Sequence, residues 1–171
     1  MPMKTNAKRI AALALLAAVS FVLVFLSAIA PTLRLALLAA AGLPAAAAVL
    51  LYRTRDGFLV YAVSGLLALL FLPFKATAIL FALFFGCYPV LKSLIERRRS
   101  LPIEWLLKLL FFNAILTILV LFFGALLTEV LTEGVLLPIL YLAGNAVFAV
   151  YDIGLTGLLS VLQKQLKRLN L

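Results

Sequence analysis

Long apolar runs alternate along this chain with short segments that carry most of its charge. Each run is close to the roughly 20 residues that a helix needs to cross a bilayer. The runs are 10–30, 33–52, 57–73, 74–95, 103–128 and 135–162. The third and fourth meet in the sequence LFLPFK, where Pro73 favours a tight turn. The pattern predicts six membrane-spanning helices.

The composition indicates a membrane protein. Of 171 residues, 67% are hydrophobic and 12% are charged, and the mean hydropathy is +1.25. A soluble domain carries about 25% charged residues and leaves a large share of its surface in water. We therefore expect an all-α integral membrane protein with a single transmembrane domain over residues 1–171. The run 10–30 is interpreted as a retained helix, because it is longer than a signal-peptide core.

The positions of the basic residues predict the orientation. With the N-terminus in the cytoplasm, twelve of the fifteen Lys and Arg residues fall in cytoplasmic segments. Arg34 and Lys75 fall on the outer side, and Lys108 lies in the fifth run. This bias is typical of cytoplasmic loops, so both termini are expected in the cytoplasm. The net charge of +9 predicts contact with membrane lipids, not with nucleic acid. A bacterial-type cytoplasmic membrane is the expected location.

The densest basic cluster is ERRRS at 96–100. We interpret it as a cytoplasmic loop between the fourth and fifth helices that meets anionic headgroups. A site for an acidic ligand is the alternative.

Several kinds of chemistry are excluded. The chain has one cysteine, Cys87, and no histidine, which excludes zinc sites built from Cys and His clusters and any His-based triad. No glycine loop ending in Gly-Lys-Ser/Thr is present, so the chain does not hydrolyse nucleotide by itself. We expect no enzyme activity, no cofactor and no metal, and any uphill transport would draw on a partner or an ion.

The sixth run contains a polar stripe. Tyr141, Asn145, Asp152 and Thr156 are spaced by four, seven and four residues, which places them on one helical face. A carboxylate well inside a membrane is costly unless it is paired, solvated or protonated, and so it marks a candidate functional site. Asp152 is therefore a candidate for ligand binding or proton coupling, and a structural salt bridge is equally open.

Three basic residues are candidate partners of Asp152, namely Lys108, Lys75 and Arg34. Lys108 also has Glu104 four residues earlier, which favours a local pair on one helix.

Other polar residues are candidates for ligand contact. Asn113 and Thr117 share one face of the fifth helix, and Asn113 is also expected to hydrogen-bond between helices. Arg34 and Lys75 either bind an anionic group of a ligand or extend to the outer headgroups. The candidate ligand-binding residues are Arg34, Lys75, Asn113, Tyr141, Asn145 and Asp152.

Small residues line one side of the first helix. Ala7, Ala11, Ala14 and Ala18 are spaced by four, three and four residues, and Phe21, Phe25 and the leucines are expected at other angles. A small-sided face lets another helix approach closely in lipid. It is a candidate docking face for a partner helix, although alanine is abundant throughout the chain. The second run is also small-sided, and Pro44 is expected to kink it.

These features together resemble the substrate-binding (S) component of energy-coupling-factor transporters. The resemblance rests on the six-helix topology, on KRIAALALLAAVSFVLVF at 8–25, where Ala14 and Ala18 match the family's Ala-x-x-x-Ala coupling motif, and on GFLVYAVSGLLALLF at 57–71. It implies a vitamin- or micronutrient-binding protein that docks on a transmembrane coupling protein driven by two cytoplasmic ATPases. The first outer loop, around APTLR, is shorter than that family's lid, and no signature names a ligand.

The chain also resembles the MreD type of rod-shape membrane proteins, which are short, six-helical and act as scaffolds in cell-wall synthesis. That resemblance implies protein contacts in place of a ligand pocket. A small ion-coupled carrier that uses Asp152 is a third hypothesis.

Overall fold

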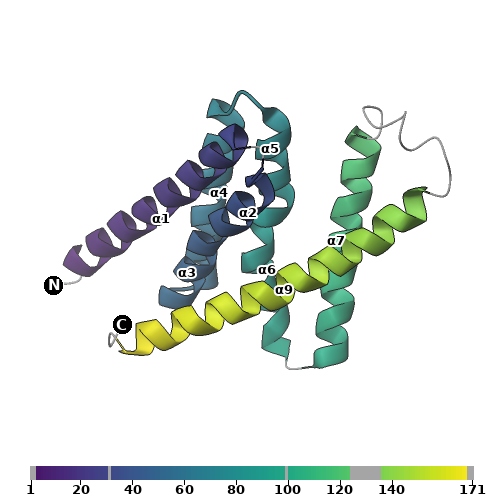
Figure 1. The fold of residues 1–171 in the computed structure, drawn as a ribbon. Coiled ribbons are helices and arrows are strands. Elements are labelled where there is room, and N and C mark those ends of the chain that lie inside the picture. The colour runs from purple at the N-terminus through teal and green to yellow at the C-terminus, as the bar shows by residue number, and fades with distance from the viewer. Residues whose placement is uncertain (1–2, 31, 99, 124–135, 169–171) are drawn as a thin grey trace. The chain divides into compact units, whose positions relative to one another are not determined.

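The computed structural model describes residues 3–30, 32–98, 100–123 and 136–168. Throughout these ranges the chain is helical apart from short connections, and six helical stretches are long and apolar enough to cross a membrane. The elements are α1 (Met3–Ile29), α2 (Arg34–Ala41), α3 (Leu43–Leu51), α4 (Thr54–Phe71), α5 (Lys75–Leu80), η1 (Phe81–Phe85), α6 (Cys87–Ile95), η2 (Glu96–Arg98), α7 (Leu101–Phe123) and α9 (Leu136–Arg168). Figure 1 shows their courses. The predicted all-α class and the six long apolar helices are confirmed.

The contacts between helices divide the chain into two units. Unit 1 comprises Met1–Leu94 and Leu162–Leu171, and unit 2 comprises Ile95–Val161. The prediction of a single transmembrane domain stays a prediction.

Unit 1 is built around small side chains. Its core joins Ala17 of α1, Ala45 and Ala48 of α3, Val60 of α4 and Val90 of α6, and all five are at most 3% exposed. Alanine contributes little apolar area, but it allows helix backbones to approach closely, which is the main source of packing energy where lipid replaces water. The small-sided second run therefore forms part of the core of this unit.

The second predicted span breaks at Gly42 between α2 and α3. Pro44 has no backbone N–H and cannot continue the ladder of the preceding helix, which accounts for the break between α2 and α3, while the predicted kink stays a prediction. The Ser20 hydroxyl of α1 donates to the Ala41 carbonyl at 2.7 Å. A Cβ atom at Gly42 would lie 2.3 Å from the Phe85 carbonyl oxygen, so only glycine allows the close approach of η1.

The fourth predicted span contains a π-helical turn, which the sequence analysis did not anticipate. Within η1 the Gly86 N–H reaches back to the Phe81 carbonyl at 2.8 Å, one residue further than in an α-helix. The Tyr61 hydroxyl of α4 donates to the neighbouring Ala82 carbonyl at 2.8 Å. A side chain of another helix therefore satisfies a backbone group beside the wider turn.

Most predicted boundaries agree with the structure to within a few residues. The turn expected at Pro73 lies between α4, which ends at Phe71, and α5, which begins at Lys75. The first helix begins earlier than predicted, and the sixth continues to Arg168 in place of 162. The predicted end of the fifth helix at 128 and the loop after it lie outside the described residues.

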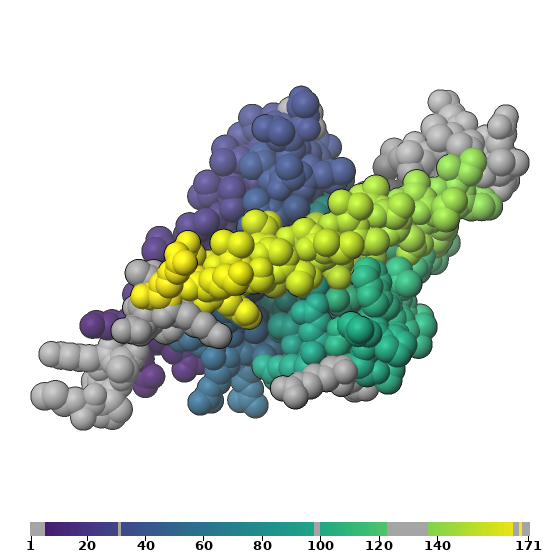
Figure 2. Space-filling model, turned by 60° about the horizontal axis from the view of Figure 1, so that its bottom comes forward, coloured from purple at the N-terminus to yellow at the C-terminus, as the bar shows by residue number. Residues whose placement is uncertain are grey.

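Unit 2 consists mainly of α7 and the portion of α9 up to Val161. Within unit 2, Leu142, Val150 and Ile153 of α9 are 76%, 72% and 63% exposed, and the surface of this helix is coloured green to yellow in Figure 2. Such exposure of large apolar side chains is rare on soluble monomers.

Candidate functional site

The polar residues of the sixth span meet polar residues of α7. The Asn113 amide nitrogen donates to the Asn145 side-chain oxygen at 2.9 Å, and Asn145 donates back to the Asn113 side-chain oxygen at 3.0 Å. Each amide also donates to a carbonyl of its own helix, that of Leu109 or Tyr141, at 2.8 Å. The prediction that Asn113 hydrogen-bonds between helices is confirmed.

A second polar contact lies one turn further along the same two helices. The hydroxyls of Thr117 and Tyr141 are 2.7 Å apart. Together with Asn113 and Asn145 they form what we call the polar ladder. Because residue numbers rise on α7 as they fall on α9, the two helices are antiparallel in a fixed register. The ring stack of Phe112 and Phe148, with centroids 4.6 Å apart, fits the same register.

A charge cluster lies next to the polar ladder, on the side nearer the N-terminus of α7. The Lys108 ammonium lies 2.9 Å from Asp152 Oδ2 and 2.7 Å from Glu96 Oε1. The side chains of Lys108 and Asp152 are 5% and 4% exposed, and Glu96 is 35% exposed. The Trp105 ring lies 5.7 Å from the same ammonium. Of the three candidate partners, the structure pairs Asp152 with Lys108, and it adds Glu96 from the ERRRS segment.

The six candidate ligand-binding residues belong to two units. Asn113, Tyr141, Asn145 and Asp152 lie in unit 2, in the ladder and the charge cluster. Arg34 begins α2 and Lys75 begins α5, both in unit 1 and both exposed. The Lys75 ammonium donates to the Leu69 carbonyl at 2.7 Å and so caps the C-terminal end of α4. A role in ligand binding stays a prediction for all six.

The four alanines of the predicted docking face are all exposed on α1. The core side of this helix carries Ala17, Ser20 and Val24 instead, each at most 3% exposed. The expectation that Phe21 and Phe25 lie at other angles from the alanines was wrong, because they follow Ala14 and Ala18 by seven residues each, which is close to two helical turns. The alanine face therefore continues into an aromatic segment.

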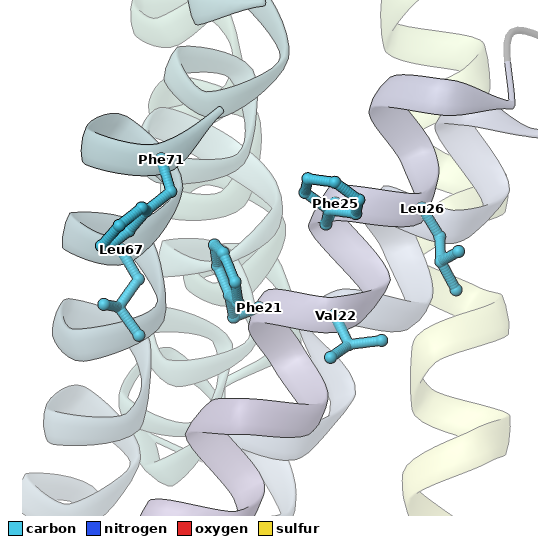
Figure 3. A pocket seen from close by; sticks show the side chains of 6 residues that line it. All are labelled: Phe21, Val22, Phe25, Leu26, Leu67 and Phe71. Carbon is cyan, nitrogen blue, oxygen red and sulfur yellow. The ribbon is translucent and has the colours of Figure 1, made fainter. Parts of the chain in front are cut away.

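That aromatic segment borders a groove in unit 1. The groove has a volume of about 450 Å³ and is lined by Phe21, Val22, Phe25 and Leu26 of α1 and by Leu67 and Phe71 of α4. Figure 3 shows the six side chains on the two helices. Phe21 and Phe71 meet edge to face across it, with ring centroids 6.3 Å apart. All lining side chains are apolar, so the groove is suited to a hydrocarbon and offers no side-chain group for acid–base chemistry.

One ion pair was not anticipated. Arg9 of α1 binds both carboxylate oxygens of Asp56 of α4, at 2.5 and 2.7 Å, and its guanidinium lies 5.8 Å from the centre of the Tyr52 ring. The Asp56 side chain is 2% exposed. From the sequence, Arg9 is expected only to help fix the orientation of the first helix. An acidic residue in an otherwise basic segment was the available indication of this pair.

Comparison with known proteins identifies no relative. No protein-family model, no curated protein and no solved structure matches the chain.

Proposed function

We propose that the chain crosses a bacterial-type cytoplasmic membrane six times with both termini in the cytoplasm. The exposed apolar faces of the spans support insertion, because lipid tails would cover them. The Arg9–Asp56 pair brings the beginnings of α1 and α4 to one end of unit 1. Lys8, Arg53 and the bound Arg9 belong to that end, as the positive-inside rule requires of a cytoplasmic side.

We further propose that the protein is the substrate-binding subunit of a micronutrient uptake transporter. One observation carries the proposal: the four alanines at 7, 11, 14 and 18 are exposed, although the packed core of the unit lies against another side of the same helix. A strip of small side chains gains little from facing lipid and more from a closely packed helix. That helix would belong to a transmembrane coupling protein driven by cytoplasmic ATPases. The ligand would be a small molecule bound without chemical change.

The test is co-purification of the tagged, full-length protein from its native membrane in mild detergent. The wild type is expected to bring down a membrane protein and two ATPases. Ala14→Trp is expected to abolish that recovery, because the indole prevents close approach. Ala62→Trp, at an exposed alanine of α4, is the matched control and should leave recovery unchanged. Equal recovery with both variants would reject the alanine face as the docking site.

A scaffold of the MreD type is the second candidate, and the polar ladder favours it. The ladder's amides and hydroxyls bind one another and their own backbones, as in a packed helix pair. Groups arranged in this way hold two helices together without requiring a ligand. Recovery of cell-wall synthesis proteins without any ATPase would support this function over transport. The use of Asp152 in an ion-coupled carrier stays a prediction.

A further inference from the structure

The apolar groove of unit 1 occupies a defined depth in the proposed membrane. α1 and α4 run in the same direction, because Arg9 meets Asp56 near their beginnings and Phe21 meets Phe71 further along. The groove therefore lies toward the C-terminal ends of both helices. Val22 and Leu26 on its α1 side are 52% and 45% exposed, so the groove is accessible from the side. Its volume is within the range of ligand-binding pockets.

Each helix that forms the groove is followed closely by an exposed cation. α1 ends at Ile29 and Arg34 begins the next helix, while α4 ends at Phe71 and Lys75 begins the next. The bond from the Lys75 ammonium to the Leu69 carbonyl holds that charge within one turn of Phe71. Both cations thus follow, in the sequence, the C-terminal ends of the two helices that line the groove, where the proposed spans would leave the hydrocarbon layer.

We propose that this groove holds an acyl chain of an anionic phospholipid, whose phosphate lies between Arg34 and Lys75. The apolar walls match a hydrocarbon chain, and the two cations match a negative headgroup at the membrane surface. A bilayer lipid is the favoured occupant because the groove opens from the side of two spanning helices, where acyl chains are the solvent. The proposal needs only the membrane-spanning arrangement and does not depend on the transport function.

The charge contribution is large enough to measure. A basic residue near an anionic headgroup contributes about 1 kcal/mol, or about fivefold in occupancy. Occupancy by phosphatidylglycerol should therefore exceed occupancy by phosphatidylcholine, and Arg34→Gln or Lys75→Gln should each lower this preference about fivefold.

The experiment is photocrosslinking of the full-length protein in phosphatidylcholine nanodiscs. Each sample contains a trace of phosphatidylglycerol or phosphatidylcholine with a diazirine in one acyl chain, and labelled peptides are located by mass spectrometry. We expect the phosphatidylglycerol probe to label residues 21–26 and 67–71 more strongly than the phosphatidylcholine probe does. The Arg34→Gln/Lys75→Gln double variant should label equally with both.

A second pair of variants tests the groove itself. A helical side chain covers the surface N-terminal to its own position, so Leu26→Trp should fill the groove and remove labelling at 67–71. Leu15→Trp is the matched control, because residue 15 lies three turns earlier on the same side of α1 and is 66% exposed.

Two results would overturn the proposal. Equal labelling by both probes at every exposed apolar face would mean that only unspecific surrounding lipid is present. Displacement of both probes from the groove by decanoate, without any preference for phosphatidylglycerol, would assign the groove to a free lipophilic acid.

Discussion

The pair formed by Asn113 and Asn145 allows a direct test of what the polar stripe does. Replacing either asparagine by leucine removes both reciprocal bonds between α7 and α9. The remaining amide keeps one bond to its own helix, to the Leu109 or the Tyr141 carbonyl. It is therefore not left wholly unsatisfied, which limits the cost of each single variant.

The expected magnitude follows from the number of bonds. Side-chain hydrogen bonds between membrane helices average about 0.6 kcal/mol each, so two bonds predict a coupling free energy of about 1.2 kcal/mol. We expect each single variant to lower the free energy of unfolding by about 1–2 kcal/mol, the cost of losing bonds in a half-buried site. The double variant should lose less than the sum of the two singles, by the coupling energy.

The assay is a double-mutant cycle on the full-length protein in bicelles, with unfolding driven by SDS. Trp105 is the only tryptophan and lies on α7, so its fluorescence reports on this hairpin. Gln163→Leu, at an exposed amide of α9, is the matched control and should change stability little. Single-variant losses that add within about 0.3–0.5 kcal/mol would show that the two amides do not interact. Unchanged stability with lost ligand binding would assign the amides to a pocket instead.

Two further predictions concern unit 1, and the first takes its control from α9 in unit 2. Gly42→Ala should lower the free energy of unfolding by about 2 kcal/mol or more, because its Cβ would overlap the Phe85 carbonyl. Gly154→Ala, with no atom within 4 Å of the added carbon, should raise this free energy by about 0.5–1 kcal/mol. Equal effects of the two variants in the same SDS titration would contradict the close approach at Gly42. Arg9→Gln should lower the free energy of unfolding by about 1.5–3 kcal/mol, since it leaves the Asp56 carboxylate buried without the guanidinium. Restoration of stability when Arg9→Gln is combined with Asp56→Asn would identify that carboxylate as the cause, whereas a double variant as unstable as the single variant would argue against it.

The six long apolar helices were predictable because hydropathy and the length of a bilayer-crossing helix constrain them strongly. The break at Gly42 was also predictable, since Pro44 removes a backbone donor whatever surrounds it. In contrast, the π-turn at 81–85 has no signal in its sequence FALFF. It accompanies the bond from Tyr61 to the Ala82 carbonyl, and such a contact between separate helices is invisible to local pattern.

For the candidate site, the sequence predicts only which polar residues of α9 share one helical face. The four-residue spacing on α9 placed Tyr141 and Asn145 together, but it did not state which residue of α7 would meet each. That depends on the register of two helices, which side-chain packing sets. The partner of Asp152 was likewise reduced to three candidates by sequence and to Lys108 by the antiparallel arrangement of α7 and α9.

The ion pair between Arg9 and Asp56 has a consequence for biosynthesis. These residues are 47 positions apart, and the second apolar span lies wholly between them. During synthesis, the Arg9–Asp56 pair can therefore form only after the beginning of α4 has been made. Chains normally form structure from the N-terminus as they are made. A chain stopped after the second span would keep the contacts of α1 with α2 and α3 but would lack the Arg9–Asp56 pair, so the beginning of α1 gains its buried partner only once α4 has been started.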